Sequence, residues 1–347
     1  MIKMDIKSLA LEELKEELVR MGEKSFRGDQ IYEWLHRKAA RSYDEMSNVS
    51  RALRERLREE TILVALEAVR VQESELDGTK KYLFALPDGN LVESVWMSYH
   101  HGNSVCISSQ VGCRMGCRFC ASTLGGLERN LTPSEMLDQI YAIGRLTGQR
   151  VSNVVVMGTG EPLDNYDNLL RFLRLLTDER GLHMSQRNIT VSTCGIAPNI
   201  RRLADEKLQI TLALSLHATT DTKRRALMPV TDRYPLAEVL SACEYYFERT
   251  GRRITFEYSL SEGINDTEED AAELIAIARR LNCHVNLIPI NPVRERSFTA
   301  PRRERVTAFK NKLENGRINV TVRREMGRDI DGACGQLRRR EMDGEGI

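Results

Sequence analysis

The amino-acid sequence predicts an α/β protein with a largely parallel sheet. From about residue 104 onward, short apolar runs alternate with amphipathic stretches of ten or more residues. The short runs are apolar throughout, and polar or glycine residues follow nearly every one of them. Apolar strands separated by helices indicate parallel βαβ units with both sheet faces covered. Six or seven such units favour a full or partial barrel over a short open sheet, although a doubly wound sheet stays possible.

The N-terminal region is expected to be a small helical bundle. Apolar residues Leu11, Leu14 and Leu18 recur at helical spacing, and amphipathic stretches follow at 26–38 and 47–60.

The pattern changes from helix to strand at about residue 80. The runs "KKYLFAL" and "NLVESVWMSY" are joined by Asp88 and Gly89, which is typical of a β-hairpin. We therefore divide the chain into an N-terminal helical domain (1–75), a β-hairpin linker (76–104), an α/β core (105–337) and a basic tail (338–347).

The core alternates regularly between the two kinds of element. Strands are predicted at 104–109, 152–158, 187–193, 209–217, 253–260, 284–291 and 318–324, and helices at 131–146, 165–176, 197–206, 235–251, 268–282 and 303–316. The first of these helices begins with a capping box, in which Thr132 is the N-cap, Pro133 the first helical residue and Glu135 the reciprocal partner.

Composition narrows the class of protein. The chain has 347 residues, a net charge of +1 and no apolar run of the roughly 18 to 20 residues that a membrane helix needs. We expect a cytoplasmic protein that does not contact a membrane. In a reducing compartment its eight cysteines favour metal binding or catalysis over disulfides. Basic clusters recur at 223–225, 302–303, 323–324 and 338–340. Solvated surface charge explains most of them, and those at 302–303 and 338–340 are candidates for contacts to a nucleic-acid backbone.

Three cysteines in one short loop form a metal site that is one ligand short. Cys113, Cys117 and Cys120 stand in "CRMGCRFC", and no second CxxC motif follows along the chain. Structural zinc sites use four protein ligands, so zinc would need a fourth ligand from elsewhere. The alternative is a 4Fe-4S cluster with one iron left open, where a substrate can bind.

The motif CxxxCxxC, with Phe119 before its last cysteine, resembles that of the radical S-adenosylmethionine (SAM) superfamily. This resemblance implies a partial (βα)6 barrel and a 4Fe-4S cluster whose open iron chelates SAM. "GTGEP" is similar to the superfamily's "GGE" element. Further motifs, "CISSQVGC", "MGTGEPLDNYDN", "VSTCG", "LALSLHA", "NLIPINP" and "DIDGACGQL", resemble those of the RlmN family, which methylates carbon 2 of adenosine in 23S rRNA and tRNA.

The resemblance implies a role for each matching residue. Cluster ligands would be Cys113, Cys117 and Cys120, and SAM contacts would be Gly160, Glu161, Ser192, Ser215, Leu216, His217 and Asn291. Cys334 would carry a methyl group taken from one SAM, and a second SAM would yield the radical that activates this methyl group. Cys106 would resolve the resulting protein–RNA adduct by forming a disulfide with Cys334, and Glu93 would accept a proton. The implied partners are rRNA, tRNA and an electron donor such as a flavodoxin, and we expect a monomer.

Two rival interpretations stay open. A Cfr-like enzyme shares the cysteine set but methylates carbon 8 of adenosine, and the residues at Val111 and Pro162 favour RlmN over it. A zinc-stabilised RNA-binding protein without catalysis would be colourless, whereas a protein with the cluster would be brown.

Overall fold

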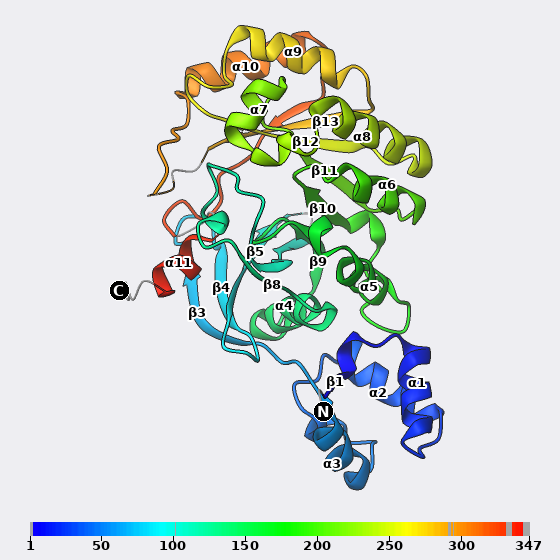
Figure 1. The fold of residues 1–347 in the computed structure, drawn as a ribbon. Coiled ribbons are helices and arrows are strands. Elements are labelled where there is room, and N and C mark those ends of the chain that lie inside the picture. Colours follow the sequence, from blue (N-terminus) through cyan, green and yellow to red (C-terminus); the bar gives the residue numbers. More distant parts are fainter. Residues whose placement is uncertain (1–2, 101, 291–292, 294, 331–334, 343–347) are drawn as a thin grey trace.

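Ten strands form one sheet in the computed structural model, which describes residues 3–100, 102–290, 293, 295–330 and 335–342 (Figure 1). The strand order within the described residues is β14-β13-β12-β11-β10-β9-β6-β5-β4-β3. Seven of these strands are parallel: β6 (Gly102–Cys106), β9 (Val151–Val156), β10 (Ile189–Thr193), β11 (Thr211–Ser215), β12 (Ile254–Leu260), β13 (Cys283–Pro289) and β14 (Val320–Val322). The sheet is open, because β14 and β3 are its two edges.

The parallel strands follow one another in chain order across the sheet, which is the arrangement expected for a partial barrel rather than a doubly wound sheet. The helices between them are α4 (Pro133–Thr147), α5 (Tyr166–Thr177), α6 (Ala197–Asp205), α7 (Asp221–Leu227), α8 (Leu236–Thr250), α9 (Glu268–Ala278) and α10 (Arg303–Asn315). The capping box predicted for α4 is present: the Thr132 hydroxyl accepts from the Glu135 amide at 3.3 Å, and the Glu135 carboxylate accepts from the Thr132 amide at 2.9 Å. The predicted fold class is confirmed.

Three antiparallel strands extend the sheet beyond β6. They are β3 (Glu67–Glu73), β4 (Lys80–Ala85) and β5 (Leu91–Tyr99), and each pairs with its neighbour in antiparallel register. The predicted hairpin corresponds to β4 and β5. Residues 67–73 differ from the expectation, because they lie in the region assigned to the helical domain yet form β3. This strand alternates exposed and half-buried residues, as an edge strand with one face in solvent does.

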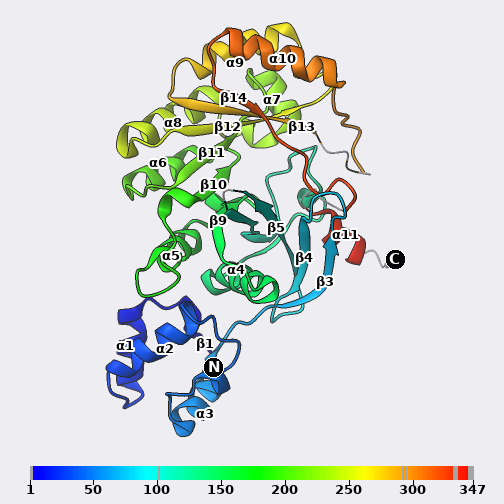
Figure 2. The ribbon, with the colours of Figure 1, turned by 180° about the vertical axis from the view of Figure 1, so that it is seen from behind.

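The N-terminal helices dock on the outer side of the sheet, beneath α4 and α5, as Figures 1 and 2 both show. They are α1 (Leu11–Arg20), α2 (Phe26–His36) and α3 (Arg51–Glu60), with a short parallel pair of strands, β1 (Met4–Asp5) and β2 (Thr61–Ile62). Lys7 forms a fully buried ion pair with Asp138 of α4 at 2.7 Å. The Tyr32 hydroxyl donates to Asp178 at 2.9 Å. Because a buried charge pair needs an exact partner geometry, these contacts fix the orientation of the helical bundle on the core.

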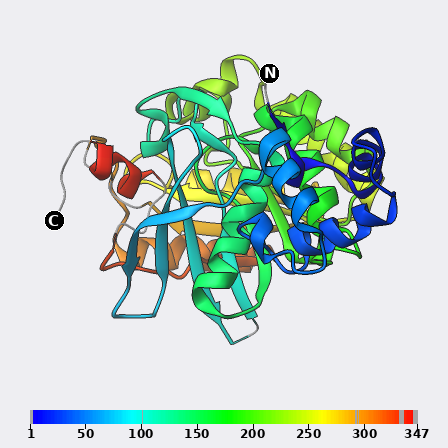
Figure 3. The ribbon, with the colours of Figure 1, turned by 90° about the horizontal axis from the view of Figure 1, so that it is seen from below.

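The C-terminal helix lies against the antiparallel extension. Helix α11 (Gln336–Met342) packs beside β5 and includes the first residues of the predicted basic tail. In Figure 3 it lies at the opposite side of the molecule from the N-terminal helices. A small antiparallel pair, β7 (Gln110–Gly112) and β8 (Leu127–Asn130), flanks the loop that carries the three clustered cysteines.

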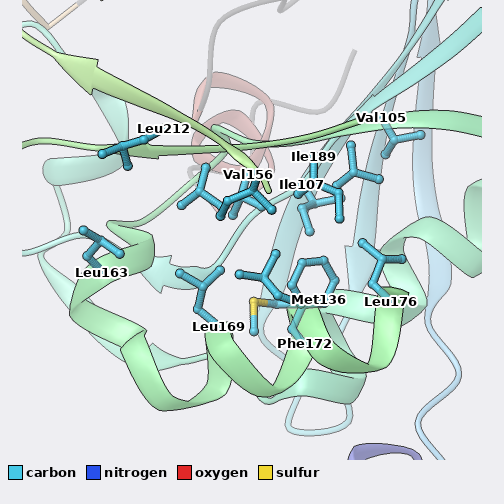
Figure 4. Close-up of a cluster of buried hydrophobic side chains, with 14 of the residues drawn as sticks. Val105, Ile107, Met136, Val156, Leu163, Leu169, Phe172, Leu176, Ile189 and Leu212 are labelled. Atoms are coloured by element: carbon cyan, nitrogen blue, oxygen red, sulfur yellow. The ribbon is translucent and has the colours of Figure 1, made fainter. Parts of the chain in front are cut away.

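Apolar side chains between the parallel strands and their helices form the core. Figure 4 shows Leu169, Phe172 and Leu176 of α5 facing Val156 and its neighbours on the sheet. Each of these side chains is at most 1 % exposed. Burying one such side chain is worth about 1.5 to 3 kcal/mol, so this layer holds the strand ends in place. Among the described residues, no helix is both long and apolar enough to cross a membrane.

Candidate active site

A cavity of about 270 Å³ opens at the C-terminal ends of the parallel strands. Its walls include the last residues of β9, β10 and β11 and residues near the ends of β12 and β13. Eight of the residues implied by the family resemblance line it: Cys113, Cys117, Cys120, Gly160, Glu161, Ser192, Ser215 and His217. Leu216 is fully buried and is not part of the cavity wall. Asn291 lies outside the described residues.

The cysteine loop is held by backbone hydrogen bonds on both sides. The Cys113 amide donates to the Gly126 carbonyl at 2.8 Å, and the Arg118 amide donates to the Leu227 carbonyl at 2.9 Å. The Thr123 hydroxyl lies 3.0 Å from the carbonyl oxygens of both Cys117 and Cys120. The loop is therefore fixed before any ligand binds.

The chemistry of the three thiols suits a cationic metal cluster. Burial raises the pKa of Cys113 to about 12, and the negative charges of Glu161 and Cys120 add to this effect. Burial also raises the pKa of Cys117 well above its usual range, with further contributions from Cys120 and Cys113. Three thiolates can share this pocket only if a metal neutralises their charge.

In the part of the chain that the structure describes, no group of three His, Cys, Asp or Glu side chains is arranged to hold one metal ion. A 4Fe-4S cluster has no such requirement, because each thiolate binds a different iron atom. The three cysteines that line the cavity therefore fit the cluster that the motif implies.

The turn after β9 requires glycine at two positions. A Cβ atom on Gly158 would lie 2.7 Å from the Ile107 carbonyl oxygen. Gly160 has a φ of +110°, and a Cβ atom there would lie 2.8 Å from the Gln110 amide nitrogen. The two glycines let this turn approach the loop after β6 closely enough to form one cavity wall.

Glu161 joins the ends of two strands. Its buried carboxylate accepts from the Leu163 amide at 3.0 Å and from the Cys194 amide, directly after β10, at 2.7 Å. Burial raises the pKa of Glu161, and the hydrogen bond from Cys194 acts in the opposite direction. Both carboxylate oxygens thus hold the backbone of the cavity wall.

His217 presents a defined tautomer to the cavity. Its Nδ1 atom accepts from the Ser259 amide at 3.0 Å, so the proton of the neutral ring lies on Nε2. Burial lowers the pKa of His217 to about 3, and the positive charge of Arg224 adds to this effect. The ring packs edge-on against Phe119 of the cysteine loop, with the ring centroids 5.0 Å apart. The imidazole is therefore a neutral donor beside the cluster loop.

Glu257 is a cavity residue that the sequence analysis missed. It lies on β12, accepts from the Asn286 side chain at 2.8 Å and lines the cavity together with Arg323. Burial raises its pKa, and the hydrogen bond from Asn286 opposes that effect. A charged residue within the otherwise uncharged strand "ITFEYSL" was the available signal, because charged side chains are seldom buried without a functional or structural partner.

Glu93 lies outside this cavity and anchors the C-terminal segment. This buried carboxylate of β5 accepts from the Gly335 amide at 2.7 Å and from the Arg338 amide at 2.6 Å. It also forms a buried ion pair with Lys81 of β4 at 3.0 Å. The carboxylate therefore caps the N-terminal end of α11, directly after Cys334, which itself lies outside the described residues.

The turn between β3 and β4 binds the chain just before residues 331–334. The Asp329 carboxylate accepts from the Ser74 hydroxyl at 2.6 Å and from the Glu75 amide at 2.8 Å. The Asp77 carboxylate accepts from the Gly327 amide at 3.0 Å. Cys106 is buried at the C-terminal end of β6, where the parallel and antiparallel parts of the sheet meet, and it is not among the residues that line the cavity.

Two family models match the chain. Residues 107–275 match the model of the radical SAM superfamily, and residues 4–63 match that of the ribosomal RNA large subunit methyltransferase N-terminal domain.

Curated relatives match nearly the whole chain. A probable dual-specificity RNA methyltransferase RlmN of Lachnospira eligens is 63% identical over 98% of this chain and 97% of the relative. The protein with the same description from Lachnoclostridium phytofermentans is 60% identical over 98% of this chain and 96% of its own length. A solved radical SAM methyltransferase from Sphaerobacter thermophilus superposes with a TM-score of 0.92 at 44% identity, covering 96% of this chain and 98% of that one.

Proposed function

The chain belongs to the RlmN family of radical SAM RNA methyltransferases, and on that basis we propose that it methylates carbon 2 of a specific adenosine in 23S rRNA and in tRNAs. One observation carries the proposal: the three motif cysteines and the polar strand-end residues line the same cavity. Carbon 2 of adenine lies between two ring nitrogens and is electron-poor, so it cannot attack the methyl group of SAM directly. An enzyme acting on it needs the radical route that the superfamily provides.

Cys113, Cys117 and Cys120 would hold a 4Fe-4S cluster, and the open side of that cluster would face the cavity. When bound, the cluster supplies the electron that cleaves SAM. The chain's own residues shape the space beside it. The neutral His217 donates from Nε2, and the turn at Gly160 brings backbone groups close to the place where the amino acid part of SAM would bind.

Cys334 and Cys106 would carry the methyl transfer on the protein itself. We propose that the Cys334 thiolate displaces the methyl group of one SAM, and that a second SAM activates this methyl group for bonding to the adenine. The Cys106 thiolate would then attack the Cys334 sulfur, and the bond between that sulfur and the transferred carbon would break. The carbon keeps the electron pair of the broken bond and takes up a proton to complete the methyl group. The disulfide between Cys106 and Cys334 is two electrons more oxidised than the two thiols, so an external reductant must reset it.

Glu93 would serve this step chiefly by placing Cys334. Its carboxylate accepts two backbone amides and pairs with Lys81, and these contacts hold the chain directly after Cys334 in place. The role of proton acceptor stays a prediction. The anchoring of Gly335 and of Asp329 supports the proposal that the antiparallel extension presents the Cys334 loop to the cavity.

RNA would bind across the N-terminal helices and the basic C-terminal segment. The protein would act as a monomer in the cytoplasm. Contacts of arginine and lysine to phosphates predict binding that weakens as salt rises. The target base must leave its stack to reach the cavity. An electron donor such as a flavodoxin would reduce the cluster.

Nucleoside mass spectrometry tests the proposal. The reconstituted protein is incubated anaerobically with rRNA or tRNA, SAM and a reductant, and fragmentation locates the methyl group. We expect 2-methyladenosine from the intact protein and none from Cys334→Ala. Methylation at carbon 8 would assign the chain to the Cfr-like activity. If a protein with a verified cluster gave no methylated adenosine, the proposed substrate would be wrong.

A further inference from the structure

Arg224, on the short helix α7, is a fully buried arginine for which the proposed chemistry has no role so far. Its side chain is 0 % exposed, and it is the largest of the fully buried side chains. A guanidinium stays charged in proteins and is costly to bury unless an anion compensates it.

The hydrogen bonds of Arg224 go to neutral oxygen atoms. Its guanidinium donates to the carbonyl oxygens of Cys194 at 2.5 Å, Ser215 at 3.3 Å and Leu216 at 3.3 Å, and to the Thr231 hydroxyl at 3.0 Å. Its neighbours on α7 are different: Lys223 pairs with Asp270, and Arg225 pairs with Asp232. No ion pair among the described residues includes Arg224, so its charge is hydrogen-bonded but not neutralised by a carboxylate.

The position of Arg224 indicates where the missing anion would be. Cys194 and Ser215, whose carbonyls it binds, line the cavity together with Cys117. The end of α7 also supports the cysteine loop, because the Leu227 carbonyl accepts from the Arg118 amide and Met228 lines the cavity. The guanidinium thus lies directly behind the cavity wall, on the side of the cysteine loop.

Electrostatics connect the same groups. Burial lowers the pKa of Arg224, and the negative charges that Cys194 and Cys117 carry when ionised oppose this effect most strongly, ahead of Asp221. In return, Arg224 counteracts the effect of burial on the pKa of Cys117.

We propose that Arg224 is the buried counter-charge of the 4Fe-4S cluster, and that it also holds the ends of β10 and β11 in register with the cluster loop. It is a positioning and electrostatic residue, since its bonds reach the cavity only through the backbone of Cys194, Ser215 and Leu216. The inference rests on the proposed cluster site and not on the RNA substrate.

The proposed charge has a measurable consequence. Reduction adds an electron to a cluster that already bears three thiolates, and a nearby buried cation stabilises that added charge. Removing the cation makes reduction harder. We expect Arg224→Gln to lower the reduced fraction at a fixed potential about tenfold or more, which is a shift of roughly 59 mV to more negative potential for a one-electron couple.

The experiment is a redox titration of reconstituted protein without RNA, followed by electron paramagnetic resonance of the reduced cluster. Arg224→Lys keeps the charge and should keep a potential near that of the parent protein. Arg225→Gln is the matched control, because it removes an exposed cation one residue away. Iron content and the melting temperature of the cluster-free protein are measured for each variant.

The outcomes separate a charge effect from a merely structural one. A lower melting temperature for cluster-free Arg224→Gln with an unchanged potential would overturn the proposal. If Arg224→Gln does not fold, Asp221→Asn decides: removing this carboxylate beside Arg224 should shift the potential in the less negative direction, and no shift would overturn the proposal. Failure of the parent protein to bind iron would instead contradict the proposed cluster site.

Discussion

The parallel and antiparallel parts of the same sheet use buried polar groups for different purposes. The ends of the parallel strands surround an open cavity with serines, glycine backbone and a neutral histidine. The antiparallel strands β4 and β5 instead bury a charge pair, Lys81 and Glu93, and direct it to the protein's own C-terminal segment. One part thus offers groups to a ligand, and the other holds a segment of the chain.

Because of this difference, a single fold can bind a ligand with one part of its sheet and hold its own C-terminal segment with the other. The parallel part is suited to cofactor binding, because all its strand ends point to one edge. The antiparallel strands join the sheet at β6, and their residue Glu93 holds the C-terminal segment there. Cys106 stands at that junction.

The largest effect on the site at the parallel strands should come from removing a proposed cluster ligand. Cys117→Ala should reduce the iron content of reconstituted protein, and its methylation activity, to background, because the remaining thiols cannot hold the cluster. Cys243→Ala is the control, since this buried cysteine lies on α8 and does not line the cavity. Iron retained at the parent level by Cys117→Ala would refute the ligand assignment.

The matching test of the antiparallel part is Glu93→Gln. It removes the carboxylate that pairs with buried Lys81, and breaking such a pair typically costs about 3 to 5 kcal/mol in the free energy of unfolding. Iron binding should be unaffected. Urea unfolding measures the change, and Lys81→Met in the same chain should recover most of it. A cost below roughly 1 kcal/mol, the value of an exposed pair, would mean that the buried pair does not anchor the segment.

A change at the interface between the N-terminal helices and the core should have an effect of intermediate size on the free energy of unfolding. Burial, with a smaller contribution from Lys7, lowers the pKa of His36 to about 3, and its Nδ1 lies 3.1 Å from the Tyr141 hydroxyl. The unfolded chain takes up this proton below the ordinary histidine pKa of about 6.5, and the folded chain does so only near 3. The stability that neutral His36 contributes is therefore complete above pH 6.5 and is lost as the pH falls.

Between pH 7 and pH 5 this loss should be about 2 kcal/mol from His36 alone. His36→Gln should lose less stability than the parent protein over that interval, by the same amount. Unfolding by denaturant at the two pH values measures it. Equal losses in both proteins would show that His36 titrates normally in the folded state.

The smallest effect should come from the exposed pair between Arg338 of α11 and Glu128, whose closest N–O distance is 3.4 Å. Glu128→Ala should change the free energy of unfolding by less than about 1 kcal/mol, because solvent screens such pairs. A larger change, measured by the same unfolding experiment, would mean that Glu93 is not the main anchor of this helix.

The features that could be predicted from the sequence are local ones. Apolar runs fixed the identity of the parallel strands, and the Thr132 capping box marked the start of α4. The cysteine spacing placed three candidate ligands in one loop, which the structure brings to the cavity with residues from β10 and β11. Such patterns are legible because each depends on neighbours a few residues apart.

The features that escaped prediction depend on distant contacts. Glu93 bonds to Gly335, which is 242 residues away in the chain, and no local pattern marks either of them as a partner. Arg224 lies in a basic run that resembles solvated surface charge, and only the packing of α7 shows that it is buried. Residues 67–73 lie within the predicted helical domain but form β3, because an edge strand that alternates weakly carries little apolar signal.

We propose that the two parts of the sheet bring a radical-generating cofactor and a methylated Cys334 thiol to one cavity. The most direct test is to supply SAM with a trideuterated methyl group and to count deuterium in the methylated adenosine by mass spectrometry. We predict a product methyl group that retains two of its three deuterium atoms, with the third found in 5'-deoxyadenosine, because the methyl group is activated while bound to Cys334. A product that retains all three deuterium atoms would mean direct transfer from SAM and would contradict the account.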